Sequence, residues 1–256
     1  MSFFNKVLAS VGIGGTKVDT RLEQDTLVPG ETVRGIVEIT GGSTEQTIDS
    51  IYLSLNTVYM KESNDKKYSD TTAIDRFKIS DPFIIKPNEK KEIPFSFRLP
   101  LDTPVTIGRT KVWLSTGLDI KNAVDPTDTD YVRVLPNKGM SAILSAVEDL
   151  GFRLREADCE QASYRLRRRL PFVQEFEYVP VSGRLRGRLD ELEVVMFPGE
   201  GGEIEVLMQV DRRARGLGGF LSEALSMDES NVRLVVTQSD LPVVRDKIKA
   251  VIERYS

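Results

Sequence analysis

The stretch VPGETVRGIVEIT, residues 28–40, decides the fold class of the first half of the chain. It contains Pro29-Gly30, a dipeptide that is typical of a tight turn. From Thr32 to Thr40 apolar and polar side chains alternate, so every second side chain would face a core. The stretch therefore predicts a turn that leads directly into a β-strand with one buried face.

Further segments with the same two-residue period surround this strand and are separated by turn residues. They span residues 17–22, 51–60, 77–79, 91–99, 111–120 and 130–135. Seven short strands at this spacing are typical of a β-sandwich. We expect residues 1–135 to form an N-terminal β-sandwich domain with a short amphipathic helix at its start.

The pattern changes after Pro136, where Met140, Ile143 and Val147 lie on one helical face that ends before Gly151. Strand patterns then resume over residues 152–158, 162–170, 172–178, 183–189, 191–197, 203–210 and 232–237, with short helices over 217–225 and 241–255. We expect residues 136–256 to form a second β-sandwich with a linker helix and a C-terminal helix. The predicted fold class is all-β with a few short helices: two sandwiches joined by a short hinge, with amphipathic helices at both termini.

The composition is that of a soluble globular protein, with 40% hydrophobic and 29% charged residues. No apolar run reaches the ~20 residues that span a bilayer, and the first residues lack the features of a secretory signal. Cys159 is the single cysteine, so no intrachain disulfide can form. We expect a cytoplasmic protein. A net charge of −4 argues against a general nucleic-acid binder, which needs a basic face.

The chemistry of the chain favours binding over catalysis. There is no histidine, which excludes imidazole-based catalytic triads and the commonest zinc sites. Cys159 lies between two acidic residues, which disfavour a reactive thiolate. Three glycine clusters, near residues 12–15, 199–202 and 216–219, lack the spacing of a phosphate-binding loop. We therefore expect a non-enzymatic protein without a cofactor, which acts on protein partners.

The acidic stretch from Asp119 to Asp130 is the best metal candidate, because hard cations prefer clustered oxygen ligands. A divalent cation there would make the chain a metal-dependent binding protein or an enzyme. The stretch lacks the glycine and the closing glutamate of a calcium-binding EF-hand loop. A solvated or ion-paired loop is therefore the favoured interpretation.

Arginine is concentrated in the second half of the chain. There are 16 arginines after Asp130 and 5 before it. On predicted strands 162–170 and 183–189, alternate positions share a face. The arginines at those positions are Arg165, Arg167, Arg169, Arg184, Arg186 and Arg188. They could form an exposed basic face for an acidic partner or anionic lipid. They could equally pair with glutamates on neighbouring strands, near 175–177, 191–193 and 203–205, which is the interpretation that we favour.

The terminal helices offer two further binding hypotheses. Phe3 and Phe4 could rest on a membrane surface as a peripheral contact, or pack on their own domain, which we favour because Lys6 alone attracts anionic lipid weakly. The C-terminal helix could dock on a partner or on a second copy of the chain in a homodimer. Core packing is the favoured role for that helix too.

Two motifs resemble a known family. VPGETVRG at 28–35 and IPFSFRLP at 93–100 resemble segments of arrestin-like domains. SFFNK at 2–6, FVQEFE at 172–177 and the closing helix resemble bacterial sporulation-control proteins of the stage-zero M type. The resemblance covers nearly the whole chain. It implies two arrestin-like sandwiches and a regulatory, non-enzymatic role at the onset of sporulation.

Arrestins hold their two domains in register through a buried polar core near the domain junction. By analogy, Asp125, Asp128 and Asp130 would pair with arginines of the second half. The resemblance supplies no catalytic residue and does not identify the protein partner.

Overall fold

The computed structural model describes residues 15–63, 66–120, 125–182, 186–187, 189–211 and 231–255. Most of these residues lie in β-strands, and the remainder include two α-helices and one 3-10 helix. They form two compact units. Unit 1 contains the described residues of 1–57, 72–100 and 111–134, and unit 2 contains those of 58–71, 101–110 and 135–256.

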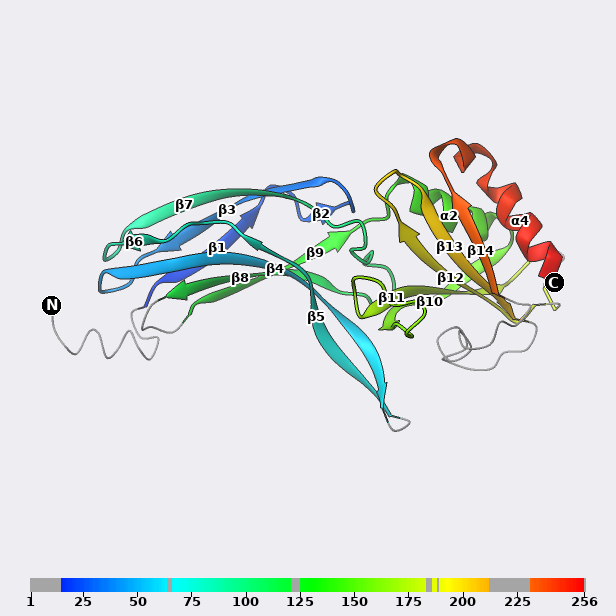
Figure 1. Cartoon of the computed structure of the whole chain (residues 1–256), viewed down its shortest axis with the longest axis horizontal. Coiled ribbons are helices and arrows are strands. Elements are labelled where there is room, and N and C mark those ends of the chain that lie inside the picture. The colour runs from blue at the N-terminus through cyan, green and yellow to red at the C-terminus, as the bar shows by residue number, and fades with distance from the viewer. Residues whose placement is uncertain are drawn as a thin grey trace. The chain divides into compact units, whose positions relative to one another are not determined.

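Unit 1 is built from two β-sheets (Figure 1). The smaller sheet has the order β1 (Lys17–Leu22), β3 (Thr32–Thr40) and β7 (Lys90–Arg98), and all its pairs are antiparallel. The other sheet contains β4 (Gln46–Ser63), β8 (Val112–Ile120), β9 (Thr127–Val134) and β2 (Thr26–Leu27), while β5 (Lys66–Lys78) and β6 (Phe83–Ile85) also pair with β4. Residues 58–63 of β4 and 66–71 of β5 belong to unit 2. This arrangement is sandwich-like.

The turn at residues 28–31 lies where the segments 28–35 and 93–100 come together. Gly30 has a φ of 92°, a conformation that glycine adopts without steric cost. The Glu31 amide donates to the Val28 carbonyl at 3.1 Å, which closes the turn. Strand β3 then pairs with β7 in the register Thr32 to Arg98. Residues 28–35 and 93–100 are therefore neighbours in one sheet.

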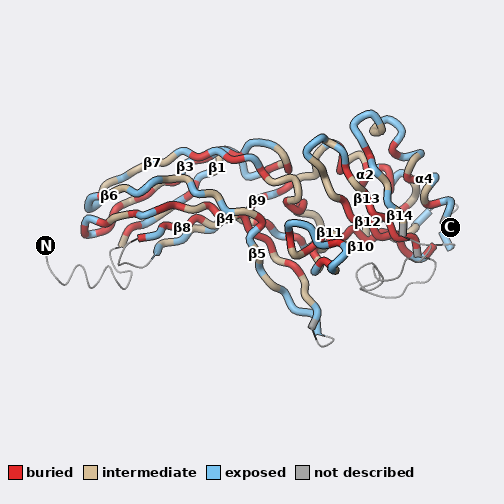
Figure 2. The backbone as a smooth tube through the Cα atoms, in the orientation of Figure 1, coloured by how far each residue is buried: buried red, intermediate tan, exposed pale blue. Residues whose placement is uncertain are grey.

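Burial follows the alternation of the strands in unit 1 (Figure 2). In β3 the buried positions include Val33, Val37 and Ile39, at every second or fourth residue. Leu53 of β4 and Leu114 of β8 are buried in the other sheet. The inner faces of the two sheets therefore supply the apolar core of unit 1.

Unit 2 contains a five-stranded antiparallel sheet whose strands follow one another in chain order (Figure 1). They are β10 (Phe152–Gln161), β11 (Phe172–Pro180), β12 (Glu191–Pro198), β13 (Ile204–Asp211) and β14 (Asn231–Val236). Helix α2 (Lys138–Asp149) precedes the sheet, and a 3-10 helix (Gln238–Val243) and helix α4 (Val244–Tyr255) follow it.

Helices α2 and α4 pack on each other, and α2 also contacts strand β10. Their apolar stripes contain Ile143, Val147, Ile248 and Ile252, all fully buried. The side chain of Asn137 caps α2 by accepting a hydrogen bond from the Met140 amide at 2.9 Å. The amphipathic patterns of both helices are therefore satisfied within unit 2.

Two segments from the first half of the chain complete unit 2. The far end of β4 pairs in parallel with β10 at Met60 and Glu160. The segment 101–110 is held by Gln174, whose side chain accepts from the Val105 amide at 2.9 Å and donates to its carbonyl at 2.7 Å. The domain boundary after residue 135 stays a prediction. In the structure, unit 2 also includes residues 58–71 and 101–110.

The prediction of a mostly β chain with few helices and sandwich-like sheets is confirmed, and so is the C-terminal helix. The predicted N-terminal helix and the helix over 217–225 lie outside the described residues. So does most of the segment 183–189, where Arg186 forms only an isolated bridge with Leu189.

The strand predicted over residues 162–170 is wrong, because this segment is a loop between β10 and β11. The Ala162 amide donates to the Pro171 carbonyl at 2.9 Å and closes the loop at its base. Its buried side chains are Ala162, Leu166 and Leu170. In a strand, Tyr164 and Arg168 would share the buried face with these residues, yet both are exposed.

Candidate functional site

A group of buried carboxylates lies on one face of the sheet in unit 2. Glu177 of β11 is directly opposite Glu193 of β12, which is directly opposite Gln209 of β13. Glu175 precedes Glu177 by two positions and therefore shares its face. We call Glu175, Glu177 and Glu193 the carboxylate cluster.

The three side chains of the carboxylate cluster are close together and buried. Each can offer one oxygen such that the three oxygens lie within 4.8 Å of one another. Burial, followed by the charge of Glu193, raises the pKa of Glu175 to about 9. The surroundings of Glu175 thus disfavour the ionised form of its carboxyl group.

Arg155 of β10 lies beside the carboxylate cluster and is part of the same face. Its Nη2 donates to Glu177 Oε2 at 2.7 Å and to Glu191 Oε1 at 2.6 Å. The strand register shifts between Leu154 and Glu156, so Arg155 occupies an irregular position in β10. This bulge directs the guanidinium toward carboxylates of both β11 and β12.

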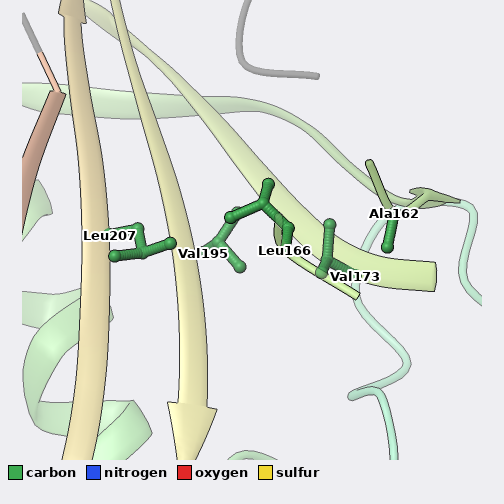
Figure 3. Close-up of a cluster of buried hydrophobic side chains, with 5 residues drawn as sticks. All are labelled: Ala162, Leu166, Val173, Val195 and Leu207. Atoms are coloured by element: carbon green, nitrogen blue, oxygen red, sulfur yellow. The ribbon is translucent and has the colours of Figure 1, made fainter. Parts of the chain in front are cut away.

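The apolar part of the same face lies next to the carboxylate cluster along each strand. Figure 3 shows the side chains that form it, which come from the loop and three strands: Ala162, Leu166, Val173, Val195 and Leu207. Val173, Val195 and Leu207 each lie two positions along the chain from a member of the cluster or from Gln209. The loop 162–171 therefore covers the apolar part of the face.

The predicted arginine sites have different surroundings in the structure. Arg168, which was not among the predicted residues, pairs with Glu205 and lies over the ring of Phe197, 3.8 Å from its centroid. Arg169 donates from Nε to Asp102 Oδ2 at 2.9 Å. Glu205, one of the glutamates expected as a cross-strand partner, also pairs with Arg233 at 2.8 Å.

Arg165 and Arg167 are exposed on the loop, and Arg186 is exposed as well. Arg184 and Arg188 lie outside the described residues. An interaction face made by these arginines stays a prediction, but the loop replaces the strand on which three of them were expected.

The predicted aspartates lie in or beside β9 and make contacts within unit 1. Asp125 accepts from the Ile120 amide at 2.9 Å, and Asp128 accepts from the Thr20 amide at 2.7 Å. Burial, followed by Asp128 and Asp19, raises the pKa of Asp130 to about 6. Pairing of these aspartates with arginines of the second half stays a prediction.

Among the residues that the structure describes, the carboxylate cluster alone brings three or more potential metal ligands together in this way. The aspartates that the structure describes in the 119–130 stretch do not form such a group.

Phe3 and Phe4 lie outside the described residues, so peripheral membrane contact stays a prediction. Within the described part of the chain, no helix has both the length and the apolar character needed to cross a bilayer.

Comparison with known proteins identifies the family of the chain. A family model described as SpoOM protein matches residues 4–214, which is most of the chain. The chain belongs to the SpoOM protein family. The predicted resemblance to sporulation-control proteins of the stage-zero M type is therefore confirmed.

A sequence match and a structural match show how far the similarity extends. The chain is 45% identical to the sporulation-control protein spo0M of Bacillus subtilis (strain 168), and the match covers 100% of both chains. The crystal structure of Spo0M from Bacillus subtilis matches with a TM-score of 0.89 at 43% identity. That match covers 95% of this chain and 100% of the other.

The sequence pattern of this SpoOM family member indicated its glutamates only as partners for arginines. It did not predict that Glu175, Glu177 and Glu193 would cluster with one another. The available signal was the pair of Glu-x-Glu repeats at 175–177 and 191–193, each inside an otherwise apolar strand. Their register could not be deduced, because residues 181–190 separate β11 from β12, and a connection of this length does not fix the pairing as a tight turn does.

Proposed function

We propose that this SpoOM family member is a non-enzymatic regulatory protein that controls entry into sporulation by binding protein partners in the cytoplasm. The observation that carries the proposal is its 45% identity to a sporulation-control protein over the full length of both chains. An arrestin-like character of its two units belongs to the same proposal, and the pairing of residues 28–35 with 93–100 supports it.

The loop 162–171 is the surface that we assign to a partner. Tyr164 is 97% exposed at its turn, and Arg165 and Arg167 are exposed beside it. Tyrosine and arginine are the residue types that most often dominate the binding energy of protein interfaces. The exposed group therefore suits a partner that offers an acidic, partly apolar surface.

The loop is also held in place before any partner binds. Leu166 is buried against Val173, Val195 and Leu207, and Arg169 pairs with Asp102. A loop that is already ordered loses less conformational entropy on binding. Tyr164 is therefore presented on a fixed support.

The test of the proposed function is genetic replacement. The gene for this chain is placed in a Bacillus subtilis strain that lacks its own spo0M gene, and the sporulation frequency is measured. We expect the frequency to return to that of the parent strain. The proposal is contradicted if the protein accumulates in folded form and the frequency stays at that of the deletion strain.

A double variant, Tyr164→Ala with Arg167→Glu, tests the loop in the same strain. We expect it to fold normally and to lose the restoring effect. The matched control is Tyr68→Ala with Arg34→Glu, which alters an exposed tyrosine and an exposed arginine elsewhere. Equal loss in both variants, or in neither, would exclude the loop as the partner surface while leaving the regulatory role intact.

A further inference from the structure

The carboxylate cluster has the oxygen donors that a hard cation requires. Glu177, Glu193 and Gln209 form one row across three neighbouring strands. Side chains directly opposite each other in antiparallel strands have Cβ atoms about 5 Å apart. Glu175 adds a fourth oxygen-bearing side chain beside this row. All the donor atoms come from a rigid sheet rather than from loops.

Gln209 supplies an observation that is independent of the carboxylates. Its side chain is 3% exposed, and its Oε1 accepts no hydrogen bond in the described structure. A buried amide oxygen without a partner is destabilising. Because Gln209 lies opposite Glu193, this oxygen is on the same face as the cluster. A bound cation would satisfy it.

The number of protein carboxylates favours calcium over magnesium. The three carboxylate oxygens lie within 4.8 Å of one another, so one cation can contact all three. Calcium accepts about six to eight oxygen ligands in a flexible geometry, several of them carboxylates. Magnesium requires a near-octahedral arrangement, retains several waters and is usually bound through one or two carboxylates.

We propose that the carboxylate cluster, together with Gln209, binds one hard divalent cation of the size of Ca²⁺. The protein contributes three carboxylate groups and one amide oxygen. The raised pKa of Glu175 is consistent with such a site, because an ion would favour the charged carboxylate that burial opposes. Arg155 pairs with Glu177 and Glu191 at the side of the cluster and would orient Glu177 toward the ion.

This site is distinct from the acidic stretch 119–130. It lies in unit 2, whereas Asp125, Asp128 and Asp130 lie in unit 1. It is also separate from the exposed group on the loop 162–171, so the proposal does not depend on the proposed function.

The test uses chelator-treated full-length protein at pH 7.5, titrated with Ca²⁺ in a calorimeter and melted with and without 1 mM Ca²⁺. We expect one ion per chain and a melting temperature that rises with Ca²⁺ concentration, because an ion that binds only the folded state stabilises it. Mg²⁺ is expected to bind at least tenfold more weakly. Absence of saturable binding up to several millimolar Ca²⁺ would overturn the proposal.

Matched variants locate the ion. Glu175→Gln retains the shape of the side chain and removes one charged ligand, and we expect it to weaken Ca²⁺ binding at least tenfold. Asp125→Asn makes the same type of change in the 119–130 stretch and is expected to leave binding unchanged. If Asp125→Asn removes binding while Glu175→Gln does not, the ion belongs to the acidic stretch and the proposal is wrong.

A second variant covers the case in which Glu175→Gln does not melt cooperatively. Gln209→Met has a similar volume and lacks the amide oxygen, and we expect it also to weaken binding at least tenfold. If Ca²⁺ has no effect and Glu175→Gln instead raises the melting temperature of the chelator-treated protein, the buried carboxyl groups are neutralised by protons alone. That result would likewise contradict the proposal.

Discussion

Asp130 is a single side chain whose surroundings penalise its charge. Its Oδ2 is buried without a hydrogen-bond partner in the described structure. Burial, Asp128 and Asp19 raise its pKa in the folded state to about 6, whereas the unfolded value is about 4. The carboxyl group therefore contributes most to stability when it is protonated, below about pH 4. That contribution is lost as the pH rises through about 6.

Asp130→Asn is expected to stabilise unit 1 at neutral pH. The amide cannot ionise, so it avoids the repulsion from Asp128 and Asp19. Because the site is partly exposed, solvent screening limits the gain to about 1 kcal/mol. Thermal melts at pH 7.5 and pH 4 check this. The variant should melt roughly 2–4 °C higher than the wild type at pH 7.5 and equally at pH 4. The same difference at both pH values would show that ionisation is not the cause.

Strand β3 shows how a single residue governs the fit of a whole element. At Gly35 a Cβ atom would lie 2.5 Å from the Arg21 carbonyl oxygen of β1 and 2.5 Å from Cζ of Phe95 in β7. Both distances are well below van der Waals contact. The central strand of the smaller sheet therefore needs glycine where Phe95 lies against it.

Gly35→Ala is expected to destabilise the protein by about 2 kcal/mol, because β3 must shift away from a neighbouring backbone. The control is Gly117→Ala in β8, where an added Cβ meets nothing within 4 Å. We expect that change to alter stability by less than about 0.5 kcal/mol. Urea denaturation of both variants measures the difference. Equal stability of the two would show that the sheet adapts to a side chain at residue 35.

The loop 162–171 and strand β11 show two limits of predicting strands from the periodicity of the sequence. Arginine and leucine alternate over part of the loop, which imitates a strand. Leu166 nevertheless inserts between Val173, Val195 and Leu207, which come from three separate strands. In β11, both faces are buried, so the period correctly predicted a strand but could not show which face carried the acidic group.

Unit 2 depends on chain segments that are remote in sequence. Tyr59 stacks with Phe172 at a centroid distance of 5.7 Å. Arg109 pairs with Asp158, and Gln174 holds residues 101–110. These contacts join residues 58–71 and 101–110 to the five-stranded sheet. A cut at residue 135 removes them all.

The fragment 136–256 is therefore expected to be less stable than the full chain. It would expose Phe172 and leave the polar side chain of Gln174 without its partners, which together cost roughly 3 kcal/mol. We expect melting about 10 °C lower than in the full chain, measured by circular dichroism, and increased binding of a hydrophobic dye. Adding residues 101–110 back through a flexible linker should recover part of the loss. An unchanged melting temperature would show that the second half folds independently.

The sequence by itself determined the β-rich class, most strand positions, helices α2 and α4, and the resemblance that the family match confirms. These features depend on local periodicity, turn residues and caps, which act over a few neighbours. Only the tertiary structure decided the carboxylate cluster, the loop under Tyr164 and the segments that complete unit 2. Each of these depends on strand register or on contacts between distant segments, and neither is encoded in a local pattern.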